Sequence, residues 1–299
     1  MLKNRFIVDF NGINFPRVNL GDRGFLKKYG SSLSNQDILK YMQFAERNNM
    51  GIASGDHNTL ETAASLNTKS FIYHSYLPLN LGQIVLPIQR CQSTLYDFLY
   101  SWSPAFASND RLVGATYTSS SHYEKVLDSD AKYLHISTIL QEKEIQEILK
   151  YKPGIVTIGG DYFDLCASLN RFDIITEVIK RYKDICLSCN SKLVLLTYMG
   201  FLLYEDSWLK NNVGYLDGLM IPYNFSGVGM VPSRNELIDW VGKLNLRVIA
   251  IHTRALNRLD TISILEFLFS QNSVDLAILG SSKFSNLEEN IKVVNDFFE

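Results

Sequence analysis

The sequence predicts a single (β/α)8 barrel, and three observations lead to this prediction. Short apolar runs rich in β-branched residues alternate with amphipathic helical patterns over nearly all of the 299 residues. The apolar runs lack strict alternation with polar residues, as expected for strands covered on both faces of a parallel sheet. The strand–helix units recur roughly every 25–40 residues without a break in composition, which favours one barrel domain over residues 1–299.

Ten segments have strand character, two more than a barrel of eight strands requires. They are Phe15–Leu20, Gly51–Ser54, Phe71–Tyr76, Leu112–Tyr117, Tyr133–Ser137, Ile155–Ile158, Leu193–Thr197, Leu216–Ile221, Arg247–Ile251 and Leu276–Leu279. We expect the surplus between residues 67 and 130, where Pro78, Pro87 and Pro104 and the aromatic stretch YDFLYSWSPAF break the rhythm. We interpret this segment as an aromatic-rich insertion near residues 67–110, over one mouth of the barrel. The alternative is an ordinary strand–helix unit with an obscured pattern.

Amphipathic helices are expected between the strands. The first begins at Ser34, whose hydroxyl can cap the helix, and Asp37 three residues on can complete a capping box. In the other helices, apolar side chains recur at the three- and four-residue spacing of a buried helical face. These helices are expected near residues 141–150, 172–185, 237–241, 264–268 and 287–294.

The charge of the chain argues against some classes of partner. The formal net charge is −2, and the Lys and Arg residues are spread along the chain. Nucleic acids and anionic membranes both require a clustered basic face, so neither is expected as the main partner. No apolar run approaches the roughly 18 residues of a membrane span, and the N-terminus lacks a signal-peptide pattern. We therefore expect a cytoplasmic protein with a small-molecule substrate; its oligomeric state stays open.

The four cysteines are too sparse for a disulfide scaffold. Cys186 and Cys189 form one CxxC pair, with no second pair to complete a tetrahedral metal site. Two free thiols are the better interpretation, and no bound metal is expected.

Polar side chains follow several expected strands, at the ends where barrel enzymes place catalytic groups. Asp56 and His57 follow the second strand, and His252 follows the seventh. Imidazole titrates near neutrality, so His57 or His252 paired with Asp56 is a candidate general base. Asp161 and Arg254 are candidate substrate contacts, Arg254 as a planar fork for a carboxylate or phosphate, or else as an ion-paired loop residue. A metal site built from His and Asp ligands is an alternative that no HxH or HExxH spacing supports.

The loop after the last expected strand has the features of an anion site. Gly280 permits close backbone approach, free N–H groups point outward at the start of the next helix, and Lys283 adds a positive charge. Barrels place their phosphate sites at the loops after strands seven and eight. The alternative is an ordinary strand-to-helix loop.

Two parts of the chain resemble a known family. They are the opening INFPRVNLGDRGF and SNQDILKYMQFAERNNMGIASGD, and the closing LDGLMIPYNF, NELIDWVGKLNLRVIAIHTRAL and SILEFLFSQNSVDLAILGSSKFSNLEENI. Both are similar to the corresponding strands and helices of the aldo-keto reductases, and together they cover about half of the chain. The resemblance implies a nicotinamide cofactor, NADP(H), whose phosphates and adenosine ribose are held at Gly280, Ser281, Ser282, Lys283, Glu289 and Asn290.

The catalytic residues of that family match this chain only in part. Asp56 aligns with the family Asp, but Glu61, which we assign to substrate binding, stands where the family Tyr should follow five residues later. The family Lys should end the third strand, and neither Leu112–Tyr117 nor Tyr133–Ser137 ends in Lys. The family His should end the fourth strand, where Gly-Gly-Asp161 stands.

Carbonyl reduction by hydride transfer needs a proton donor at the developing alkoxide, usually a Tyr whose pKa a neighbouring Lys lowers. Tyr73, Tyr76 or Tyr117 could supply this donor from another strand. Three hypotheses follow. The chain is an aldo-keto-reductase-like enzyme acting on a carbonyl compound or sugar, or a non-redox lyase, isomerase or hydrolase on the same barrel, or a catalytically inactive barrel used for binding.

Overall fold

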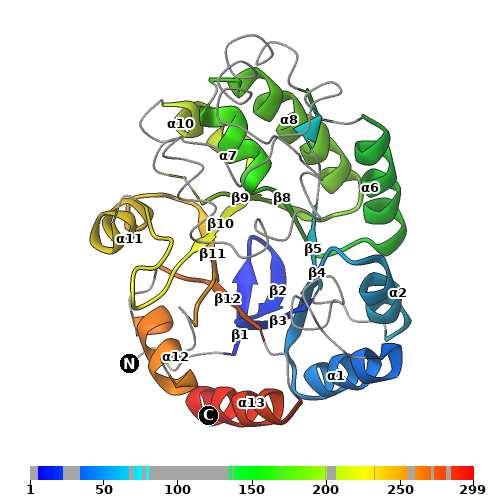
Figure 1. The fold of residues 1–299 in the computed structure, drawn as a ribbon, viewed down its shortest axis with the longest axis vertical. Coiled ribbons are helices and arrows are strands. Elements are labelled where there is room, and N and C mark those ends of the chain that lie inside the picture. Colours follow the sequence, from blue (N-terminus) through cyan, green and yellow to red (C-terminus); the bar gives the residue numbers. More distant parts are fainter. Residues whose placement is uncertain are drawn as a thin grey trace, which may run out of the picture.

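The barrel predicted from the sequence is present. The computed structural model describes residues 6–22, 34–66, 71–75, 79–80, 135–136, 138–168, 170–198, 200, 207–231, 233–254, 260–270, 273–280 and 284–299. Eight parallel strands close into a barrel in chain order, with the last strand pairing the first (Figure 1). They are β3 (Val18–Gly21), β4 (Gly51–Ser54), β5 (Phe71–His74), β8 (Ile155–Gly159), β9 (Lys192–Leu196), β10 (Gly218–Pro222), β11 (Arg247–Ile251) and β12 (Leu276–Gly280).

Helices surround the barrel and alternate with its strands (Figure 1). They are α1 (Asn35–Arg47), α2 (His57–Ser65), α6 (Thr138–Tyr151), α7 (Asp161–Ser168), α8 (Phe172–Ser188), α10 (Trp208–Asn212), the 3-10 turn η5 (Val213–Tyr215), α11 (Arg234–Gly242), α12 (Thr261–Ser270) and α13 (Phe284–Phe298). The predicted capping box is confirmed, because Ser34 and Asp37 satisfy each other's backbone N–H groups at the start of α1. Among the described residues, no helix is both long and apolar enough to cross a membrane.

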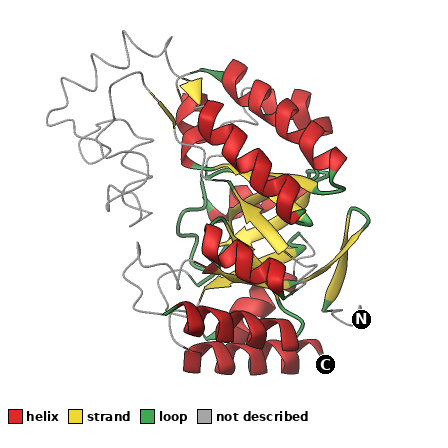
Figure 2. Ribbon diagram, turned by 90° about the vertical axis from the view of Figure 1, so that its right-hand side faces the viewer, coloured by secondary structure: helices red, strands yellow, loops and turns green. Residues whose placement is uncertain are grey.

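An N-terminal hairpin, β1 (Ile7–Phe10) and β2 (Ile13–Pro16), closes the end of the barrel where the strands begin (Figure 2). Phe10 and Phe15 are fully buried and pack with the side chains inside the barrel. The prediction of one strand over Phe15–Leu20 is therefore wrong: β2 ends at Pro16, which has no backbone N–H for a ladder, and the barrel strand starts at Val18.

The structure accounts for some of the strand candidates in excess of eight. Phe71–His74 is the third barrel strand, so the insertion does not begin before it. The Tyr133–Ser137 candidate contributes β7 (His135–Ile136), which pairs antiparallel with β6 (Leu79–Asn80) outside the barrel. The Tyr133–Ser137 candidate lies beyond residues 67–130, so the expectation that the surplus falls within that range stays a prediction. The Leu112–Tyr117 candidate and most of the aromatic-rich segment lie outside the described residues.

Side chains alternate between the inside of the barrel and the helix layer. One buried cluster, which includes Ala53, Ile72, Ile155, Val194 and Ile249, fills the barrel, and a larger one packs the strands against the helices. Since alternate residues of a strand share a face, the residue two positions after an interior residue also points inward. This rule identifies the strand-end side chains that face the barrel mouth.

Candidate functional site

The predicted residues at the end of the second barrel strand are held by contacts with helices. Asp56 caps α2, and its carboxylate accepts hydrogen bonds from the backbone N–H and hydroxyl of Thr59, both at 3.2 Å. His57 is 55% exposed; its Nε2 lies 3.5 Å from Glu61 and its Nδ1 lies 3.3 Å from Glu147 of α6. The structure therefore brings His57 and Glu61 together between α2 and α6.

Two glutamates of α6, the buried Glu144 and the partly buried Glu147, organise a hydrogen-bonded network on the helix side of β5. Glu144 accepts from Ser75 at 2.6 Å and from Tyr182 at 2.9 Å, and Glu147 accepts from the Tyr73 hydroxyl at 3.0 Å. We call these five residues the helix-side network. Tyr73 follows the interior residue Ile72, so its side chain points away from the mouth.

The network makes its tyrosines weak acids. Burial, and then the negative charge of Glu144, raises the pKa of Tyr73 and of Tyr182 far above the ordinary value. Tyr73 therefore does not have the lowered pKa that a proton donor in carbonyl reduction requires. The other tyrosines considered for this role, Tyr76 and Tyr117, lie outside the described residues.

A different set of polar side chains faces the barrel mouth. His74 lies two residues after Ile72, and its Nδ1 is 2.7 Å from the hydroxyl of Thr157, which lies two residues after Ile155. The Thr157 hydroxyl donates to the Tyr73 carbonyl at 3.2 Å, so it accepts from Nδ1–H of His74. This pattern assigns the proton to Nδ1 and leaves Nε2 as the basic nitrogen of His74.

Two further rings complete what we call the mouth cluster: His74, Thr157, Tyr198 and His252. Tyr198 packs against the interior of the barrel, and its ring meets the His252 ring edge-on at a centroid distance of 6.0 Å. Asp164 positions Tyr198 by accepting from its backbone N–H at 2.8 Å. His252 has a left-handed backbone conformation (φ 52°) directly after β11. The mouth thus presents imidazole and phenol groups at the ends of three strands, β5, β9 and β11, and the Thr157 hydroxyl from within β8.

The fourth barrel strand, β8, ends at a glycine, Gly159, which has no side chain to face the mouth. Gly159 has φ of 108°, and a Cβ there would lie 2.5 Å from the Leu196 carbonyl oxygen. Only glycine suits this position, which is where the aldo-keto-reductase resemblance would place a histidine. Asp161 opens helix α7 two residues later.

Sequence rules missed part of this arrangement. Asp22 directly follows β3, is buried, and accepts a hydrogen bond from Ser54 at the end of β4. A search for acids just after strands would have found Asp22. No comparable signal marks Thr157, because it lies inside an apolar strand.

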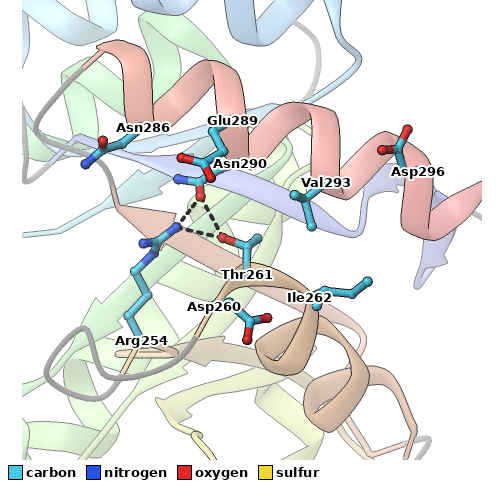
Figure 3. Close-up of a pocket in the computed structure, with 9 residues that line it drawn as sticks. All are labelled: Arg254, Asp260, Thr261, Ile262, Asn286, Glu289, Asn290, Val293 and Asp296. Atoms are coloured by element: carbon cyan, nitrogen blue, oxygen red, sulfur yellow. Dashed lines mark hydrogen bonds between the residues drawn. The ribbon is translucent and has the colours of Figure 1, made fainter.

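A pocket of about 430 Å³ lies between the end of β11, α12 and α13 (Figure 3). We call it the terminal-helix pocket; it is lined by Arg254, Asp260, Thr261, Ile262, Asn286, Glu289, Asn290, Val293 and Asp296. Three residues predicted as substrate or cofactor contacts, Arg254, Glu289 and Asn290, therefore come together here. Gly280 ends β12, and the predicted contacts Ser281, Ser282 and Lys283 lie outside the described residues.

Arg254 is the centre of the pocket's polar contacts. Its Nη2 donates to Asn290 Oδ1 at 2.5 Å and to the Thr261 hydroxyl at 3.1 Å, while that hydroxyl also donates to Asn290 at 2.6 Å (Figure 3). The Nε atom of Arg254 is buried and has no hydrogen-bond partner among the described residues. Burial lowers the pKa of Arg254, and the nearby Glu289 carboxylate opposes that effect. The guanidinium remains charged, with one buried donor unsatisfied.

Metal chemistry has no assembled ligand set in the described part of the chain. No group of three or more His, Cys, Asp or Glu side chains is placed there to hold a metal ion.

Comparison with solved structures supports the fold resemblance. Two structures from Pseudomonas aeruginosa, provisionally assigned as aldo-keto reductases, align with 100% of this chain and with 98% and 97% of their own chains. The TM-score is 0.53 for both, and sequence identity is 10% and 11%. No family model matches the sequence, and no curated protein matches it. The chain therefore shares the barrel fold of these two structures, as the sequence resemblance implied.

Proposed function

We propose that this protein binds a nicotinamide adenine dinucleotide, the cofactor class implied by the aldo-keto-reductase resemblance, and acts on a carbonyl or sugar-type small molecule. The adenosine half occupies the terminal-helix pocket, and the reactive half reaches the barrel mouth. The observation that carries this proposal is the convergence of Arg254, after strand seven, with Glu289 and Asn290 of α13, the helix after strand eight. Barrels place their phosphate-binding sites in this region.

The residues of the pocket fit an adenosine group. The unsatisfied Nε of Arg254 offers a buried donor, and buried donors strongly favour a partner. Glu289 and Asn290 add acceptors and an amide for ribose hydroxyls or an adenine amino group. The volume of about 430 Å³ lies within the range of small-molecule sites.

The cofactor would supply hydride transfer, and the chain's own residues would bind the substrate and move its proton. Since Tyr73 faces α6, this proton transfer falls to the mouth cluster. His74 is the best-oriented base, because Thr157 fixes its tautomer with Nε2 basic. Imidazole exchanges protons near neutral pH, which suits either acid or base catalysis.

A non-redox enzyme is the second candidate, and the make-up of the mouth favours it. Histidine and tyrosine face the mouth, while the family positions carry Glu61 and bare glycine backbone instead of Tyr and His. A lyase, isomerase or hydrolase could use His74 as a general base without a nicotinamide. Substrate turnover in the absence of any dinucleotide would distinguish this non-redox enzyme from the dinucleotide-dependent one.

The direct test is a fluorescence titration of the protein with NADH and with NADPH. We expect saturable binding of at least one of them at micromolar to low millimolar concentration. If neither binds at millimolar concentration, the dinucleotide proposal is wrong and the non-redox candidate takes its place.

A further inference from the structure

Five polar side chains join helices α2 and α6 on the outside of the barrel, where the two helices lie side by side (Figure 1). His57 and Glu61 belong to α2, and Glu147, Lys150 and Tyr151 belong to α6. The Lys150 ammonium lies 3.2 Å from the Glu61 carboxylate, and the Tyr151 hydroxyl donates to the same carboxylate at 3.4 Å. We call these five residues the α2–α6 clamp.

His57 lies between two carboxylates of the clamp. Its Nδ1 is 3.3 Å from Glu147 Oε1, and its Nε2 is 3.5 Å from Glu61 Oε1. A neutral imidazole has one N–H donor and one acceptor nitrogen, so one of the two carboxylates would face a nitrogen lone pair. An imidazolium carries an N–H on both nitrogens and can serve both carboxylates. The arrangement therefore suits the protonated form of His57.

Glu61 and Lys150 stay charged across the neutral range. Hydrogen bonding by Lys150, and then the positive charge of His57, holds the pKa of Glu61 below its ordinary value. Hydrogen bonds with Tyr151 and Glu61 raise the pKa of Lys150. Asp56, the neighbour of His57, is committed to capping α2. Among the groups described around His57, only the imidazole is of a type that ordinarily changes charge between pH 5 and 8.

The contact of His57 with Glu147 is the better shielded of the two. The Glu147 side chain is 14% exposed, against 53% for Glu61, so solvent screens its charge less. Its second oxygen accepts from the Tyr73 hydroxyl at 3.0 Å, which ties the clamp to β5, the strand that also carries His74. The positive end of the α2 dipole disfavours a cation at the start of that helix, so a charged His57 depends on this carboxylate.

We propose that the α2–α6 clamp is a pH-sensitive latch, closed when His57 is protonated and loosened when His57 is neutral. Because an imidazole ordinarily titrates at about pH 6.5, the latch contributes stability in mild acid and loses that contribution as pH rises through neutrality. The latch acts from the helix side of β5 and does not depend on the proposed dinucleotide function.

The test is a double-mutant cycle on the full chain, measured by urea unfolding at pH 5.5 and at pH 8.0. The unmodified protein, His57→Gln, Glu147→Gln and the double variant give the coupling between the two side chains, free of the separate effects of each substitution. At pH 5.5 the coupling should change the unfolding equilibrium constant by about threefold or more, as for a partly exposed ion pair. At pH 8.0 it should fall below about 1.5-fold, since a neutral imidazole has only one donor.

The ion pair between Lys183 of α8 and Asp217 is the matched control, because its charged atoms lie 2.7 Å apart and neither belongs to a histidine. A cycle with Lys183→Gln and Asp217→Asn should give the same coupling at both pH values. If Glu147→Gln does not fold, the exposed Glu61→Gln takes its place in the cycle, with an expected coupling of about twofold at pH 5.5.

Three outcomes would overturn the latch. Coupling of equal size at pH 5.5 and pH 8.0 would make the contact of His57 a fixed structural one. Additive substitutions at pH 5.5 would show that the charged His57 does not join the helices. A parallel loss of coupling in the Lys183–Asp217 control would assign the pH response to the protein as a whole.

Discussion

The helix-side network and the terminal-helix pocket are built from similar residues and differ in how completely those residues are satisfied. In the network, the carboxylates of Glu144 and Glu147 receive hydroxyl donors from a strand and from α8. In the pocket, a buried guanidinium nitrogen has no partner among the described residues, and carboxylates face an open volume. A satisfied polar cluster stabilises a fold, while an incomplete one beside a cavity indicates a ligand site. Variants in the two regions should therefore change different properties.

The largest effect is expected in the helix-side network. Glu144→Ala leaves the hydroxyls of Ser75 and Tyr182 without their buried acceptor and should lower the free energy of unfolding by about 3 kcal/mol. Urea unfolding followed by circular dichroism measures this change. Glu142→Ala, on the exposed side of the same helix, is the control and should cost less than about 1 kcal/mol. Equal losses of unfolding free energy in Glu144→Ala and Glu142→Ala would contradict a stabilising role for the helix-side network.

The next effect is expected in the pocket. Arg254→Ala removes the only described cation from the lining and should weaken dinucleotide binding by about 2 kcal/mol, roughly thirtyfold. Fluorescence titration with NADH measures it, and a thermal melt verifies that the variant folds. Arg171→Ala, which breaks an ion pair with Asp173 at the start of α8, should bind as the unmodified protein does. Unchanged affinity in Arg254→Ala would count against the pocket.

The network also predicts a response to alkaline pH. Tyr73 has a pKa raised above the ordinary value of 10, so the folded state keeps a proton that the unfolded state loses. This contribution is fully present below pH 10 and is lost as pH rises above it, at about 1.4 kcal/mol per pH unit. The free energy of unfolding should fall less steeply between pH 10 and 11 in Tyr73→Phe. The difference in slope should correspond to about one bound proton. Parallel declines in the two proteins would contradict this account of Tyr73.

The smallest effect concerns Asp56. Asp56→Ala removes the cap of α2 and should lower stability by about 1 kcal/mol, with no change in dinucleotide binding. Asp56→Asn, which also caps helices well, should restore most of the lost stability. If instead Asp56→Asn abolishes turnover of a substrate while the stability is kept, Asp56 is catalytic, as the sequence predicted.

The sequence predicted the fold better than the site. Buried strands such as Ile155–Gly159 are continuous apolar runs, and the capping box at Ser34 is a local pattern, so both can be read from neighbouring residues. Arg254 was found because it follows a recognisable strand end, whereas Asn290, inside α13, was implied only by the aldo-keto-reductase resemblance. Their convergence with Thr261 could not be predicted, since it depends on how α12 packs against α13.

The direction of a side chain at a strand end could not be predicted from the sequence, as His57 beside the helix-side network shows. His57 follows a barrel strand, as a catalytic residue would, yet its ring pairs with glutamates of two helices. Sequence position gives the end of a strand, but the direction of a side chain depends on which helix packs beside it. His74 lies within an apolar strand and reaches the mouth because it is two residues from Ile72.

The central claim is that a dinucleotide binds at the terminal helices and not at the helix-side network. Hydrogen–deuterium exchange with and without saturating NADH tests it directly. The account predicts slower exchange in α12 and α13 on binding, with α2 and α6 unchanged. Saturable binding that leaves α12 and α13 unprotected, or that protects α2 and α6 instead, would contradict it.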